Sequence, residues 1–132
     1  MPRTIDDVET FLYRLNRNFE ITDDIFVISS GTDRPPIAIH VAEPVVVVRV
    51  DIGEVPKNEK AQLKLFRQLL IYNASDLVHS AYALDENEIV LSAGMALENL
   101  DMNELAAVLS DIDIALARHV KTLRDIATEG AS

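Results

Sequence analysis

Apolar residues recur at helical spacing near the start of the chain. Ile5, Val8 and Leu12 lie on one face of a helix, and two acidic residues precede Val8 where the positive end of the helix dipole favours anions. The Thr4 hydroxyl can cap the first turn. This spacing predicts a helix that begins at Thr4 and ends around Asn16–Asn18.

Three runs with the character of β-strands follow, over residues 25–28, 37–42 and 45–50. The second alternates apolar and small or polar residues, as a half-buried strand does. The third, residues 45–50, is apolar at every position except Arg49. Both of its faces therefore need cover, which predicts a central strand or one covered by a second subunit.

The pattern returns to helical spacing over residues 57–72, where four cations share one side. Residues 80–84 and 88–92 then read as a hairpin around Asp85-Glu86-Asn87. A long helix begins at Asp101 and keeps one apolar face as far as Ile126. The buried face predicted for the helix over 57–72 comprises Leu63, Phe66, Leu69 and Leu70.

The resulting order is α-β-β-β-α-β-β-α, which predicts an α+β fold with helices packed on an antiparallel sheet. A chain of 132 residues is the size of one domain, so we expect a single domain over 1–132 with a disordered tail at about 128–132.

Composition narrows the classes of function. The formal net charge of -10 disfavours binding to nucleic acid or to anionic membranes. The absence of cysteine excludes disulfides and thiol chemistry. The acidic N-terminus does not resemble a signal peptide, and no stretch reaches the ~20 apolar residues of a membrane span. We therefore expect a cytoplasmic, bacterial-type protein.

Catalytic and metal-binding patterns are missing. His40, His79 and His119 have no second ligand at metal spacing, and the carboxylates are dispersed. The loop over 85–88 lacks the regular ligand spacing of a calcium loop. We predict no catalytic residue, no cofactor and no metal, and hence a protein that is not an enzyme. His119 interrupts the apolar stripe of the last helix, where it is either satisfied locally or at a subunit contact, or has a pH-sensing or ligand role.

The chain also has more apolar surface than one small core requires. Burial in a homodimer or a groove for a peptide would account for it. The cations of residues 57–67 form either a solvated helix face or a dock for an acidic segment. The candidate partner or dimer contacts are Val46, Val48, Val50, Lys60, Lys64, Arg67 and Ile114.

Several runs carry a family resemblance. They are Leu69-Leu70-Ile71-Tyr72-Asn73, Tyr82-Ala83-Leu84-Asp85, Glu88-Ile89-Val90-Leu91, and Leu100-Asp101 followed by the apolar stripe from Leu105. The chain thereby resembles the class I type III secretion chaperones and the YbjN-like family, which share one fold. The resemblance implies a homodimeric, non-enzymatic domain that holds an extended client segment along its sheet and helices. The alternative is a YbjN-like regulatory domain that binds a small ligand or a regulatory partner.

Overall fold

The computed structural model describes residues 3–29, 31 and 33–129, which form helices and one antiparallel sheet. The predicted α+β class is confirmed. The elements in chain order are α1 (Ile5–Arg14), β1 (Phe19–Thr22), β2 (Ile25–Ile28), β3 (Ile37–Ala42), β4 (Val45–Glu54), α2 (Glu59–Ser75), β5 (Ala81–Asp85), β6 (Glu88–Ala96) and α3 (Met102–Glu129).

The sheet has the strand order β1-β2-β3-β4-β6-β5, and every neighbouring pair is antiparallel. The longest strand, β4, lies in the middle between β3 and β6. Strands β1 and β5 form the two edges of the sheet. The chain leaves the sheet after β4, forms α2, and returns by way of β5, so that β6 completes the pairing with β4.

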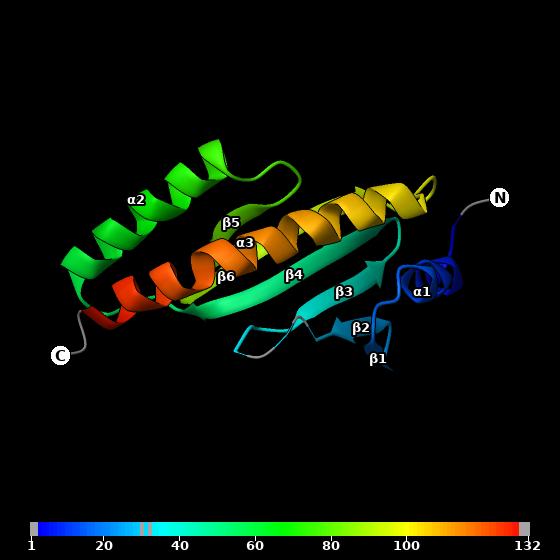
Figure 1. Cartoon of the computed structure of the whole chain (residues 1–132), viewed down its shortest axis with the longest axis horizontal. Coiled ribbons are helices and arrows are strands. Elements are labelled where there is room, and N and C mark those ends of the chain that lie inside the picture. Colours follow the sequence, from blue (N-terminus) through cyan, green and yellow to red (C-terminus); the bar gives the residue numbers. More distant parts are fainter. Residues whose placement is uncertain (1–2, 30, 32, 130–132) are drawn as a thin grey trace.

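Helix α3 runs along one face of the sheet, in front of β4 and β6 (Figure 1). Helix α2 lies beside α3 on the β5 side, and α1 lies at the opposite end near β1–β3. The core lies between α3 and the sheet, because each strand turns alternate residues toward the helix. The apolar stripe of α3 supplies the other half of this core, as its spacing predicts.

The central strand behaves as predicted in one respect and differs in another. Val46, Val48 and Val50 have no exposed surface, because they face α3 within the same protomer. They cannot reach a partner, so the prediction that they contact one is wrong. Val45 and Val47 point to the opposite face of β4, where Val45 is exposed and Val47 is half-buried.

A strand that the pattern did not predict, β1, precedes the others and pairs with β2. Its four residues, Phe19-Glu20-Ile21-Thr22, are too few for their alternation to stand out from the end of the preceding helix. Strand β4 also continues to Glu54, past Gly53, by means of a register shift between Asp51 and Gly53. A β-bulge of this kind lets a strand absorb an extra residue instead of ending there.

The buried face of α2 differs from the prediction. Leu65 and Leu69 are buried, whereas Leu63 and Leu70 are 73% and 69% exposed. The helix has apolar residues on both sides, so periodicity alone does not decide which side faces the core. Phe66 is half-buried at the boundary.

The observed ends of α3 can be compared with the predicted start at Asp101 and the predicted disordered tail. The Asp101 carboxylate accepts a hydrogen bond from the Glu104 backbone N–H at 2.8 Å, which caps the N-terminus as expected. At the other end Thr128 and Glu129 are helical, so the predicted disordered tail does not begin at residue 128. The rest of that predicted tail, residues 130–132, lies outside the described residues.

Candidate protein-binding site

The end of the sheet near α1 presents apolar side chains to solvent. Tyr13 of α1 is 65% exposed and Ile21 of β1 is 50% exposed. The rings of Tyr13 and Phe19 pack edge to face with centroids 5.1 Å apart, and Phe19 packs in the same way on Phe26 at 5.3 Å. This aromatic stack joins α1 to the first two strands and leaves one ring at the surface.

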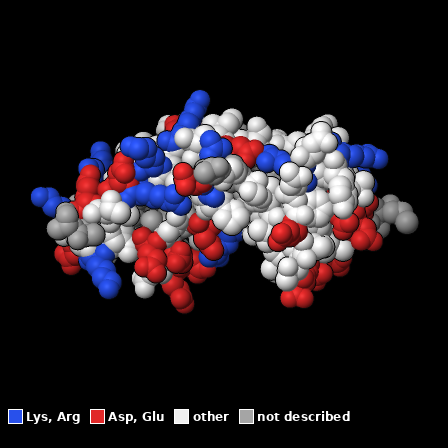
Figure 2. All heavy atoms as spheres, turned by 60° about the horizontal axis from the view of Figure 1, so that its bottom comes forward, with Lys and Arg blue, Asp and Glu red and all other residues white. Residues whose placement is uncertain are grey.

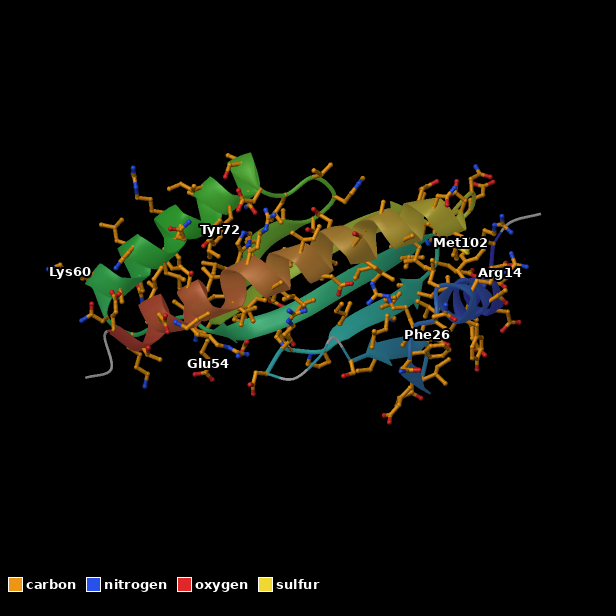
Figure 3. The ribbon with its side chains drawn as sticks, viewed as in Figure 1. Arg14, Phe26, Glu54, Lys60, Tyr72 and Met102 are labelled. Carbon is orange, nitrogen blue, oxygen red and sulfur yellow. The ribbon has the colours of Figure 1, made fainter. Side chains whose placement is uncertain are left out.

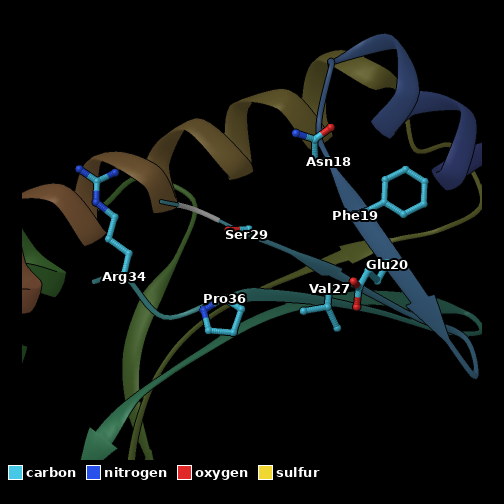
Figure 4. Close-up of a pocket in the computed structure, with 7 residues that line it drawn as sticks. All are labelled: Asn18, Phe19, Glu20, Val27, Ser29, Arg34 and Pro36. Carbon is cyan, nitrogen blue, oxygen red and sulfur yellow. The ribbon is translucent and has the colours of Figure 1, made fainter. Parts of the chain in front are cut away.

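A hollow of about 480 Å³ opens beside this stack (Figure 4). Its walls combine apolar surface with one cation and one anion, so it can hold apolar side chains and orient polar ones. A second hollow of about 340 Å³ shares Asn18 and Phe19 with it and extends to Tyr13. The first is lined by Asn18, Phe19, Glu20, Val27, Ser29, Arg34 and Pro36.

The strand that borders the hollow, β1, is an edge strand, with β2 as its described pairing partner. An edge strand keeps backbone N–H and C=O groups that can pair with an added strand. The opposite edge differs, because the Asn73 side chain there forms hydrogen bonds with the backbone of β5. Asn73 Nδ2 donates to the Tyr82 carbonyl at 3.1 Å, and its Oδ1 accepts from the Tyr82 N–H at 2.7 Å. Strand addition is therefore easier at β1 than at Tyr82 of β5.

Helix α2 carries two further surfaces on its outward side. At about 100° per residue, Leu63, Leu70 and Ala74 form an apolar stripe on the side toward β5. A hollow of about 480 Å³ lies on this stripe, and Phe66, Arg67 and Ile71 also line it. Lys60, Lys64 and Arg67 form a neighbouring basic stripe on the side toward α3, where Lys64 pairs with Glu129.

A buried polar network fixes α2 against α3 and β5. His119 of α3 is 2% exposed, and its ring stacks on Tyr72 at a centroid distance of 3.6 Å. His119 Nδ1 lies 2.8 Å from the Tyr82 hydroxyl, and Nε2 lies 2.8 Å from Asp76 Oδ2. The carboxylate of Asp76 only accepts hydrogen bonds, so Nε2 carries a proton, whereas the Tyr82 hydroxyl can either donate to Nδ1 or accept from it. Tyr72 points from α2 toward α3 (Figure 3).

The surroundings of Asp76 and Tyr82 shift the pKa values of these two residues in opposite directions. The hydrogen bond from His119, helped by one from Ser75, lowers the pKa of Asp76. Burial raises the pKa of Tyr82 far above its ordinary value, so the phenol stays neutral and can donate its proton. Two carboxylates of α3, Asp111 and Asp113, have different partners: Asp111 accepts from Ser80, and Asp113 pairs with Arg17.

Of the exposed predicted partner contacts, the structure brings together only the three cations of α2. Lys60, Lys64 and Arg67 are exposed on α2. Ile114 is 49% exposed on α3, and its position lies roughly 22 Å along the helix from Glu129, which pairs with Lys64. Sequence reasoning did not single out Tyr13, Phe19, Ile21 or Val27. The alternation Phe19-Glu20-Ile21-Thr22 is a signal for Phe19 and Ile21 only, and it is too short to stand out from the end of the preceding helix.

Within the described part of the chain, no helix has both the length and the hydropathy to cross a membrane. The same residues contain no cluster of three His, Asp or Glu side chains that could hold a metal ion.

Comparison with known proteins identifies the family of this chain. The CesT_Tir_1 family model matches residues 1–129, so the chain belongs to this family of type III secretion chaperones. No curated protein matches the sequence.

Solved structures share the fold at low identity. A chain of the heterodimeric ExoU–SpcU complex from the type III secretion system of Pseudomonas aeruginosa is 21% identical, with a TM-score of 0.68, and the match covers 86% of this chain and 95% of that one. YbjN from E. coli is 15% identical, with a TM-score of 0.63 and coverage of 86% and 91%. SycH of Yersinia pestis, solved with a fragment of YscM2, is 16% identical, with a TM-score of 0.57 and coverage of 86% and 99%.

Proposed function

We propose that this protein is a non-enzymatic secretion-chaperone-like protein, which holds an extended segment of a client protein at the β1 edge of its sheet. The observation that carries the proposal is the combination of an edge strand with an exposed aromatic stack and a hollow beside it. Main-chain hydrogen bonds to an edge strand provide affinity, and pockets for alternate side chains provide selectivity. The family and fold support a protein-binding role. The cytoplasm remains the predicted location.

Client binding at this edge is tested by replacing one side chain of β1. The protein is co-produced with each protein encoded beside its gene, and the complexes are treated with trypsin and analysed by mass spectrometry. We expect one segment of one such protein to become resistant to cleavage. Ile21→Lys should abolish this resistance, because a lysine at an edge strand opposes the addition of another strand.

The matched control is Val78→Lys, which changes another exposed apolar residue, in the connection between α2 and β5. It should leave the protected segment unchanged. The proposal fails if no neighbouring gene product is retained at micromolar concentration, or if Ile21→Lys and Val78→Lys protect the same segment equally well.

Homodimer formation is the second part of the proposal, and the apolar stripe of α2 supports it. Leu63 and Leu70 are large side chains that a monomer would leave in water. A two-fold axis across α2 would bring the stripe of one protomer against that of its partner, as an isologous interface requires. Ile114 lies on another part of the surface, on α3, and remains a predicted partner contact.

A further inference from the structure

The basic stripe of α2 stands out from the charge of the rest of the chain. Residues 57–67 contain four cations, Lys57, Lys60, Lys64 and Arg67, and one anion, Glu59, in a chain whose formal net charge is -10. Helix α2 begins and α3 ends at the same end of the molecule (Figure 1), and several Lys and Arg side chains lie at that end among Asp and Glu side chains (Figure 2). An acidic protein with one concentrated basic surface has a preferred site for anionic groups.

A hollow of about 620 Å³ accompanies the cations. It is bounded by the start of α2 and by Glu129 at the end of α3. Leu63 supplies apolar surface at its edge, beside Lys60 and Lys64. A segment bound here would therefore meet cations and one large apolar side chain together. The hollow is lined by Asn58, Lys60, Ala61, Leu63, Lys64, Arg67 and Glu129.

The protein itself places a carboxylate in this hollow. Lys64 Nζ donates to both carboxylate oxygens of Glu129, at 3.0 Å to Oε1 and 3.2 Å to Oε2. Both side chains are more than half exposed, so water screens the pair and its contribution to stability is small. A carboxylate from another molecule could replace that of Glu129 at little cost, since the same hydrogen bonds would form again.

We propose that this surface binds an acidic segment of a partner protein, with carboxylates one helical turn apart and an apolar residue between them. Lys60, Lys64 and Arg67 bind the carboxylates, and Leu63 contacts the apolar side chain. The site is separate from the β1 edge, so it serves a second partner and does not depend on the client. A peptide suits it better than nucleic acid, because the net charge of -10 repels a long polyanion.

The probe for this site is a fluorescent helical peptide with glutamates one turn apart and leucines between them. Fluorescence anisotropy measures its affinity at low and at physiological ionic strength. We expect binding that weakens with salt, and a loss of about tenfold or more in the double variant Lys60→Glu with Lys64→Glu. Glu129→Gln should strengthen binding, because it removes the carboxylate that competes for Lys64.

A second double variant, Arg14→Glu with Lys121→Glu, changes the net charge by the same amount. Arg14 lies at the other end of the molecule, on α1 (Figure 3), and Lys121 lies on the exposed side of α3. This variant should alter affinity by less than about twofold at physiological salt, where distant charges are screened. Circular dichroism checks that both double variants are folded.

Three results would overturn the proposal. The first is an equal loss of affinity in the two double variants, which would reduce the effect to overall charge. The second is equal binding of a peptide in which glutamine replaces every glutamate. The third is tighter binding of a single-stranded oligonucleotide than of the acidic peptide.

Discussion

His119 is a polar residue in an apolar helix face, and the structure explains how the core accommodates it. Its two ring nitrogens each have a partner, Tyr82 and Asp76, and Tyr72 covers one face of the ring. A buried polar group that is fully hydrogen-bonded avoids the desolvation penalty of an unpaired one. A small ligand at this position would have to displace a protein group, which weighs against the ligand-sensing alternative.

Asp111 makes a second polar link between α3 and the start of β5. Burial on its own raises the pKa of Asp111, but this effect is outweighed by the Ser80 hydroxyl and by the backbone N–H groups of His79, Val78 and Ser80, so the pKa is lowered. A carboxyl group with a lowered pKa in the folded state stabilises the fold above its unfolded-state pKa. That stabilisation is lost as the pH falls through the folded-state value.

We therefore expect Asp111→Asn to destabilise the protein by about 1–2 kcal/mol at neutral pH, because the amide replaces a charged acceptor of several hydrogen bonds. The difference from the parent protein should shrink as the pH falls below about 4, where the unfolded chain begins to bind this proton, and it should disappear once the pH has passed below the lowered folded-state pKa. Urea unfolding at a series of pH values measures it. The exposed Asp125→Asn is the control and should change stability little; a constant difference across the pH range would contradict the assignment.

At the scale of elements, α2 packs on the core with one side and presents two surface stripes with the other. Leu65 and Leu69 face the core, and the outward side carries the apolar stripe and the basic stripe. Asn73, at the end of the run Leu69-Leu70-Ile71-Tyr72-Asn73, takes the place of a neighbouring strand at Tyr82 of β5. The helix thereby protects one sheet edge while β1 leaves the other available.

The orientation of α2 is tested by two substitutions two residues apart. Leu65→Ala removes a fully buried side chain and should cost about 2–4 kcal/mol of unfolding free energy. Leu63→Ala removes an exposed one and should change this free energy by less than about 0.5 kcal/mol. Chemical denaturation of dilute protein, below the concentration at which it associates, measures both. The opposite ranking would show that the helix is rotated from its position here.

At the scale of the whole molecule, the β1 edge is separate from the two stripes of α2, which adjoin each other at Leu63 and Arg67. The β1 edge lies near α1, the apolar stripe of α2 lies on the β5 side, and the basic stripe lies between α2 and the end of α3. One protomer can therefore hold a client at the β1 edge while α2 contacts either a second copy or an acidic partner.

The homodimer is the prediction that belongs to this scale. Leu70→Glu should convert a dimer to a monomer, because a buried unpaired carboxylate at the interface would be costly. Light scattering over a range of concentrations measures the mass. Ile21→Lys is the control and should remain dimeric. A parent protein that is monomeric at high concentration would exclude the dimer, and a dimeric Leu70→Glu variant would exclude this interface.

The spacing of apolar residues predicted most of the helices and strands of this protein from the sequence alone. The stripe of α3, the alternation of β3 and the hairpin of β5 and β6 follow from the spacing of apolar residues, because that spacing reflects which side of an element avoids water. The class of fold followed from the order of elements and the family resemblance from particular residue runs, and both are confirmed.

Tertiary contacts decided the rest. Whether Leu63 or Leu65 of α2 faces the core depends on where α3 and β5 lie, and those elements are distant in the sequence. The run Val45–Val50 of β4 is apolar except at Arg49, and this pattern did not reveal that Val46, Val48 and Val50 belong to the protomer's own core. The edge at β1 and the pairing of His119 with Asp76 likewise arise from contacts between distant segments, which no local pattern encodes.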